Sequence, residues 1–277
     1  MAIEETEINR WLFEVFLRRE SLEDFEAPIV ALAKLCRNRD EFELIAHTIE
    51  KLVALSQPQF NKQITSLVSY IKRNVMYDAP IAIVATAWGD KPDSSQQLVQ
   101  LLKPYFRSYK SVSFFNSVNN FEKKNNIEKY PRFILVDEFS GTGNTIIGRV
   151  RHISQQAKSR GSQIDPYVGL LFGMENALEA IRAEGINVHF CGELKAGISG
   201  YFSGDERERR INIMKRLEEE LSSEWDGEQL PSLGYGAAEA LFFVKNMNAP
   251  NSNFPIFWWP YDATETERET LMRRAEP

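Results

Sequence analysis

The pattern of hydrophobic residues along this chain changes near residue 77. Before that point the apolar positions follow the 3.6-residue period of a helix, as in the stretch from Trp11 to Phe16. A second stripe of the same kind runs from Leu44 to Leu55, and Pro58 interrupts it. A further helix is expected from about residue 60 to 74. The pattern therefore predicts an all-helical domain over residues 1–76.

After residue 77, short apolar runs alternate with helical patterns. Strands are expected at residues 81–84, 133–136, 167–172 and 187–191, and helices at 95–102, 145–159 and 175–183. Such alternation predicts an α/β domain, here residues 77–277, with a mostly parallel sheet flanked by helices. Folds of this kind bind ligands beyond the carboxyl ends of their strands. A charged, amphipathic helix at 205–224 is expected to lie on the sheet or at a subunit contact.

The segment from Phe133 to Thr145 carries the candidate chemistry, because an apolar run ends in two acids and a glycine-rich turn follows. Backbone N–H groups at a helix start bind phosphate where glycine lets the anion approach. The expected phosphate-binding residues are Ser140, Gly141, Thr142, Gly143, Asn144 and Thr145. Asp137 and Glu138 can accept hydrogen bonds from the vicinal hydroxyls of a ribose. The alternative is an acidic strand end that only caps the next helix.

The phosphate loop of nucleoside triphosphatases is a rival interpretation of this turn. That motif needs a lysine before its final hydroxyl residue and a glycine at its first position. Here Asn144 replaces the lysine and Glu138 replaces the glycine, so the rival fails.

The segment resembles the phosphoribosyl diphosphate (PRPP) binding motif of type I phosphoribosyltransferases. The resemblance implies that family's fold, with Asp137 and Glu138 as catalytic residues that hold the ribose and residues 140–145 around its 5-phosphate. It also implies Mg²⁺, held through the ligand and water near the two acids rather than by direct protein ligands. Purine-specific members often carry an acid at the position of Gly141, and this chain does not.

A pyrophosphate-binding loop follows the first sheet strand in that family, and residues 86–95 stand in its place here. The residues that the resemblance assigns to it are Trp88, Gly89, Asp90, Ser94 and Ser95. Lys91 would counter charge on the leaving pyrophosphate. The alternative is a surface loop in which Asp93, Ser94 or Ser95 caps the next helix.

A second resemblance lies in the tail, at Gly234–Glu239 and Asn248–Trp259. It is similar to a predicted phosphoribosyltransferase-like group of bacterial conflict (antiphage) systems, some members of which accompany retron reverse transcriptases. Phe257, Trp258 and Trp259 could form a hood that stacks on a base, or they could seal the domain core.

Three functions fit these residues. The first is an enzyme that binds PRPP or a related phosphoribosyl ligand and transfers or cleaves at the ribose anomeric carbon, as an antiphage effector. The second is a non-catalytic module that senses PRPP or a nucleotide. The third is a glycohydrolase acting on nucleotides or the nicotinamide dinucleotide. A defence partner such as a reverse transcriptase complex, or a second copy of the chain, is the expected protein partner.

Composition narrows the remaining classes. The chain has 277 residues and a formal net charge of −6, which argues against strong autonomous nucleic-acid binding. No apolar run reaches the ~20 residues that span a bilayer. Cys36 and Cys191 form no paired motif, which suits a reducing compartment, and the expected location is the cytoplasm.

Overall fold

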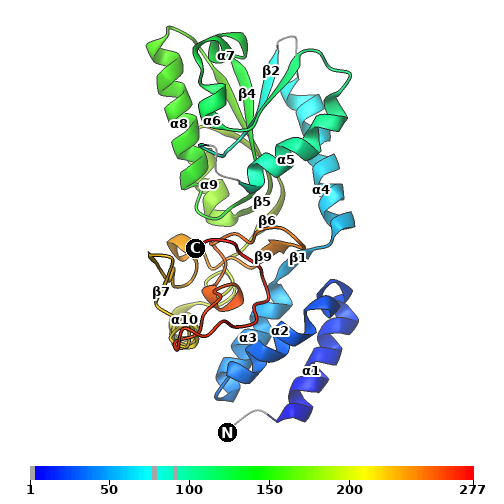
Figure 1. The fold of residues 1–277 in the computed structure, drawn as a ribbon, viewed down its shortest axis with the longest axis vertical. Coiled ribbons are helices and arrows are strands. Elements are labelled where there is room, and N and C mark those ends of the chain that lie inside the picture. The colour runs from blue at the N-terminus through cyan, green and yellow to red at the C-terminus, as the bar shows by residue number, and fades with distance from the viewer. Residues whose placement is uncertain (1–3, 77–79, 90–92) are drawn as a thin grey trace. The chain divides into compact units, whose positions relative to one another are not determined.

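The computed structural model describes residues 4–76, 80–89 and 93–277 (Figure 1). The chain forms two compact units, one made of Met1–Pro58 with Lys195–Pro277 and the other of Gln59–Leu194. These limits differ from the predicted ranges 1–76 and 77–277, because the two ends of the chain share one unit. No helix in the described ranges is long and apolar enough to cross a membrane.

The unit Gln59–Leu194 is built on a five-stranded parallel sheet with the strand order β3-β2-β4-β5-β6. Its strands are β2 (Ile81–Ala85), β3 (Val112–Phe115), β4 (Arg132–Ser140), β5 (Asp165–Met174) and β6 (Asn187–Leu194). The parallel α/β sheet is confirmed, and β3 is a strand that the apolar pattern did not predict. Because β3 lies on one side of β2 and β4 on the other, the chain changes direction between β2 and β4.

Helices cover both faces of this sheet (Figure 1). They are α4 (Gln57–Tyr70), α5 (Ser94–Leu102), α6 (Val118–Phe121), α7 (Lys124–Lys129), α8 (Asn144–Ser159) and α9 (Glu175–Ala183), with short turns at Ile71–Val75 and Lys103–Phe106. The apolar sides of α6, α7, α8 and α9 share one core with β2, β4 and β5. Helices α4 and α5 lie on the opposite face. A right-handed crossover explains this placement, since β2 and β4 connect in opposite directions.

The other unit begins with the helices that the 3.6-residue period predicts. Its elements are α1 (Glu5–Arg18), a 3-10 helix at Glu20–Phe25, α2 (Glu26–Leu35), α3 (Arg39–Lys51), β1 (Val53–Leu55), α10 (Gly204–Glu218), β7 (Glu224–Trp225), β8 (Glu228–Gln229), β9 (Phe242–Val244) and 3-10 turns at Tyr235–Ala237 and Pro255–Phe257. Strand β1 pairs in parallel with β9. The expectation that residues 1–76 are helical throughout is therefore wrong at 53–55, where pairing with a distant segment overrides the local pattern.

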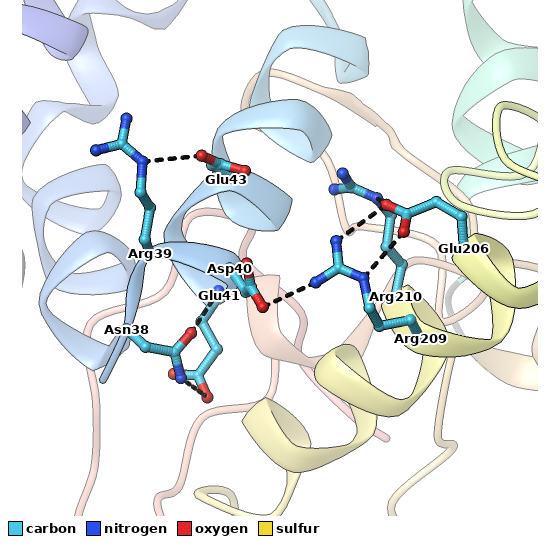
Figure 2. Close-up of polar contacts among 8 residues, drawn as sticks. All are labelled: Asn38, Arg39, Asp40, Glu41, Glu43, Glu206, Arg209 and Arg210. Carbon is cyan, nitrogen blue, oxygen red and sulfur yellow. Dashed lines mark hydrogen bonds and ion pairs between the residues drawn. The ribbon is translucent and has the colours of Figure 1, made fainter. Parts of the chain in front are cut away.

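Helix α10 belongs to the unit that contains both chain ends, where it packs against α3. Its apolar side places Ile213, Met214 and Leu217 in the core. Figure 2 shows the polar rim of this contact, where Arg209 bonds Asp40 at 2.8 Å and Glu206 at 2.9 Å. The helix ends at Glu218, earlier than the predicted residue 224. Since the ion pairs are exposed, the buried apolar side contributes most of the stability of this contact.

Candidate functional site

The two acids lie near the carboxyl end of β4, beside the end of β2. Ala85 is the register partner of Val136, so the next residues along the two strands, Thr86 and Asp137, are neighbours. The Thr86 hydroxyl donates a hydrogen bond to Oδ2 of Asp137. This is the point where the chain changes direction in the sheet, the usual place of a ligand crevice in α/β folds.

Burial and charge together perturb both carboxyl groups. Burial, and then the charge of Glu138, raises the pKa of Asp137 well above its ordinary value. Burial also raises the pKa of Glu138, although hydrogen bonds with Asp137 and Ser94 act in the opposite direction. Oε2 of Glu138 is buried and has no hydrogen-bond partner in the described part of the chain. The pair therefore has unused acceptor capacity, and a donor or cation bound there would relieve its electrostatic cost.

The glycine-rich turn joins β4 to α8. Gly143 is the residue before the helix, and no side chain caps the helix start. The N–H of Asn144 makes a long contact of 3.4 Å with Oγ1 of Thr142. The alternative in which the acids cap α8 is thus wrong. Because the helix start carries partial positive charge and open N–H groups, it can accept an anion.

The predicted phosphate-binding residues differ in their exposure. Ser140 is the last residue of β4 and is buried, whereas Asn144 and Thr145 are exposed. Gly141 and Thr142 are half-buried between them. Exposure thus increases along the loop, from the buried end of β4 to the exposed polar side chains at the start of α8.

The loop after β2 is held mainly by its own hydrogen bonds. Asp93 caps α5 by accepting from the Ser95 N–H at 2.8 Å, as the capping alternative predicts. The Ser95 hydroxyl is buried and accepts from the Ala87 N–H at 3.1 Å, so it is not available to a pyrophosphate. Ser94 faces Glu138. Trp88 is exposed.

Of the three remaining residues predicted in this loop, the structure describes one. Gly89 follows Trp88 at the edge of the described loop and is half-buried. Asp90 and Lys91 lie outside the described residues, so their assignments stay predictions.

The tail aromatics do not form a hood. Phe257, Trp258 and Trp259 are at most 1% exposed and belong to the core of the unit that contains both chain ends. The indole N–H of Trp258 donates to the Asn253 carbonyl at 3.0 Å, and that of Trp259 to the Ser222 hydroxyl at 2.8 Å. A base cannot stack on rings that have no open face. The stacking assignment is wrong, and the alternative that these residues seal the core is correct.

Two residues that the motifs did not single out adjoin the site. Thr86 contacts Asp137, as described above. Arg149, on α8, donates from Nε to the Thr86 carbonyl at 3.1 Å, and its guanidinium lies over the Trp88 ring. No local signal identifies Arg149, because its contacts lie in the loop after β2, which the packing of α8 brings beside it.

The described residues around the acids form no cluster of metal ligands. Among the described residues, no three His, Cys, Asp or Glu side chains group as metal ligands. A cavity of about 170 Å³ belongs to the other unit, where Trp11, Arg19 and Lys51 are among its lining residues, and it contains none of the predicted site residues.

Comparison with known proteins gives one strong match. The family described as PRTase-CE matches residues 35–274 of this chain. No curated protein matches it.

Solved structures give weaker similarities. Orotate phosphoribosyltransferase from Aeropyrum pernix is 14% identical, covering 50% of this chain and 72% of that one, with a TM-score of 0.32. The Helicobacter pylori xanthine-guanine-hypoxanthine phosphoribosyltransferase is 13% identical over 52% of this chain and 85% of its own, with a TM-score of 0.32. Orotate phosphoribosyltransferase from Mycobacterium tuberculosis H37Rv, solved in complex with PRPP, is 15% identical over 55% and 79%, with a TM-score of 0.31. At these scores the similarities carry no argument about the chemistry of this chain.

Proposed function

The chain belongs to the PRTase-CE family, and on the geometry of its acids and turn we propose that it binds PRPP or a related phosphoribosyl ligand. We further propose that it transfers or cleaves at the anomeric carbon of the ribose. One observation carries the proposal: an acidic pair, with Glu138 buried and Asp137 half-buried, has unused acceptor capacity and lies one short turn away from an uncapped helix start. A sugar with a terminal phosphate has donors and an anion in the matching order.

Asp137 and Glu138 would accept hydrogen bonds from the ribose 2- and 3-hydroxyls, while the amides that open α8 receive the 5-phosphate. In the reaction, the bond from the anomeric carbon to the diphosphate oxygen breaks as a bond to the acceptor forms. The diphosphate leaves with the electron pair. The residues of this chain would act by holding the sugar in place and by balancing charge, which are the main contributions available without a covalent intermediate.

Magnesium fits the acidic pair chemically. Carboxylate oxygens are the ligands that hard divalent cations prefer, and the unpartnered Oε2 of Glu138 is such an oxygen. Asp137 and Glu138 would hold the ion through its water shell. When bound, Mg²⁺ neutralises charge on the diphosphate. The metal would also favour the ionised form of both acids, whose pKa values are raised in the free protein.

Incubation with PRPP and Mg²⁺ tests the proposal. We expect pyrophosphate release, with or without an added acceptor, and its loss in the double variant Asp137→Asn plus Glu138→Gln. Asp165→Asn is a matched control, because Asp165 lies at the opposite end of the same sheet and pairs with Arg132. If the double variant keeps wild-type activity, the acids do not hold the ribose.

Two alternative functions, a sensing module and a glycohydrolase, would use the same site. They are kept because Gly141 stands where purine-specific phosphoribosyltransferases often carry an acid that serves as a base towards the purine. A sensing module would bind PRPP tightly with no turnover, and calorimetry would detect this. A glycohydrolase would consume nucleotides or the nicotinamide dinucleotide with water alone, which mass spectrometry of the small molecules would show.

The similarity of the tail to proteins of bacterial conflict systems supports a role in antiphage defence, with a reverse transcriptase complex as the candidate partner. Phage challenge of cells expressing the wild-type chain or the acidic-pair variant tests this role. Equal phage titres on both would reject it.

A further inference from the structure

Arg149 is held in a fixed orientation beside the loop that follows β2. Its Nε donates to the Thr86 carbonyl at 3.1 Å, and its Cζ lies 4.4 Å from the centroid of the Trp88 ring. His152 packs against the edge of the same ring at 4.7 Å. A guanidinium held by a hydrogen bond and by stacking on an aromatic ring loses little further freedom when it binds a ligand.

Arg149 forms no ion pair with a carboxylate of the described residues. By contrast, Arg151 on the same helix pairs with Glu184 at 2.8 Å. The charge of Asp93 acts on Arg149 without forming an ion pair, and the hydrogen bond from the guanidinium to Thr86 uses Nε alone. Its two η nitrogens therefore have no partner within the described residues and can bind an anion.

The position of this cation relative to the acids is set by one residue. Thr86 accepts from Arg149 through its carbonyl and donates to Asp137 through its hydroxyl. The guanidinium is thus on the β2 side of the acidic pair, while the turn that precedes α8 follows the acids along β4. An anion bound at Arg149 and an anion bound at the turn would occupy different subsites.

We propose that Arg149 binds the diphosphate of the phosphoribosyl ligand through its η nitrogens, an inference that rests on the proposed function. The planar guanidinium matches two phosphate oxygens at once, which a lysine cannot do. Trp88 and Thr86 hold the guanidinium in place, and the acids and the α8 turn bind the rest of the ligand.

Ribose 5-phosphate provides the discriminating probe, because it has the sugar and the 5-phosphate of PRPP but no diphosphate. We expect Arg149→Gln to weaken PRPP binding by roughly 10- to 100-fold, the effect of losing charge-assisted hydrogen bonds, and to leave ribose 5-phosphate binding unchanged. Arg149→Lys keeps the charge without the planar fork and should fall between wild type and Arg149→Gln.

Isothermal titration calorimetry of the full chain with both ligands, in one Mg²⁺ buffer, measures this. Arg151→Gln is the matched control, because it removes an arginine from the same helix at an exposed ion pair. It should bind both ligands as the wild type does. A thermal unfolding transition of each variant tests whether it is folded. If Arg149→Gln does not fold, Arg149→Lys is compared with the wild type instead.

The outcomes separate the two proposals. If Arg149→Gln binds PRPP as the wild type does, or loses both ligands equally, the diphosphate assignment is overturned while the phosphoribosyl site stands. If wild-type protein binds neither ligand, the phosphoribosyl site itself is overturned, and the assignment of Arg149 with it.

Discussion

Gly143 offers the sharpest test of the turn that opens α8. Its φ is +80°, in the left-handed region that favours glycine. A Cβ added there would lie 3.0 Å from the Ala177 carbonyl oxygen and 3.3 Å from Cγ1 of Ile181. Gly143→Ala therefore combines an unfavourable backbone conformation with contact against the backbone of α9.

The two contributions can be given rough sizes. A left-handed conformation costs an L-residue about 1–2 kcal/mol. The contact with a backbone carbonyl adds to this, so we expect Gly143→Ala to lower the free energy of unfolding by about 2–3 kcal/mol. At roughly 2–4 °C for each kcal/mol, the melting temperature should fall by roughly 4–12 °C. Relief of the contact would also shift the loop amides, so affinity for ribose 5-phosphate should fall.

Gly148 is the matched control in the same helix. A Cβ there meets no atom within 4 Å, so Gly148→Ala should raise the free energy of unfolding by about 0.5–1 kcal/mol. Urea unfolding followed by circular dichroism measures both variants, and calorimetry measures ligand affinity. If the two alanine variants are equally stable, the argument that the turn requires glycine at 143 is refuted.

Three further predictions follow from buried polar groups. Burial raises the pKa of Asp137 above its ordinary value of 3.8, so ionisation of this carboxyl lowers the stability of the fold as the pH rises. In urea unfolding, Asp137→Asn should therefore be more stable than the wild type at pH 8, and the difference should vanish near pH 3. Burial raises the pKa of Glu218 from 4.5 to about 7, so wild-type stability should decrease between these pH values, and Glu218→Gln should flatten that part of a pH–stability curve. Asn253→Ala should lower the free energy of unfolding by roughly 2–4 kcal/mol in the same assay, because it removes hydrogen bonds that buried backbone groups make to this side chain. The Asn253 side chain bonds the Phe242 N–H at 2.7 Å and the Phe242 carbonyl at 2.8 Å. Unchanged stability of Asn253→Ala, or an Asp137→Asn difference that does not vary with pH, would contradict these assignments.

Local patterns predicted much of the parallel sheet. The predicted strands at 81–84, 133–136, 167–172 and 187–191 all lie within observed strands. For the central strands the reason is that a strand buried on both faces needs a continuous apolar segment. The position of Asp137 and Glu138 near a strand end, and the helix start that follows, could also be read directly. Both features depend on residues that are adjacent in the chain.

Features that depend on distant residues were missed. Strand β1 forms because Val53–Leu55 pairs with Phe242–Val244, nearly two hundred residues later. In the sequence, the tail aromatics are compatible with either a ligand-stacking role or burial in the core, because a run of three aromatic residues reads the same in both cases. Only the packing of Trp258 and Trp259 in the core distinguishes these cases.

The order of strand, acids, glycine turn and helix follows from local sequence, since strand burial, turn conformation and helix initiation depend on a few adjacent residues. The sequence also determined that the turn lacks the lysine of a nucleoside triphosphatase loop. Tertiary structure alone decided which side chains surround the acids. Sheet register places Thr86 beside Asp137, and helix packing brings Arg149 to the same loop. Register and packing minimise the free energy of the whole unit, and no single segment encodes them.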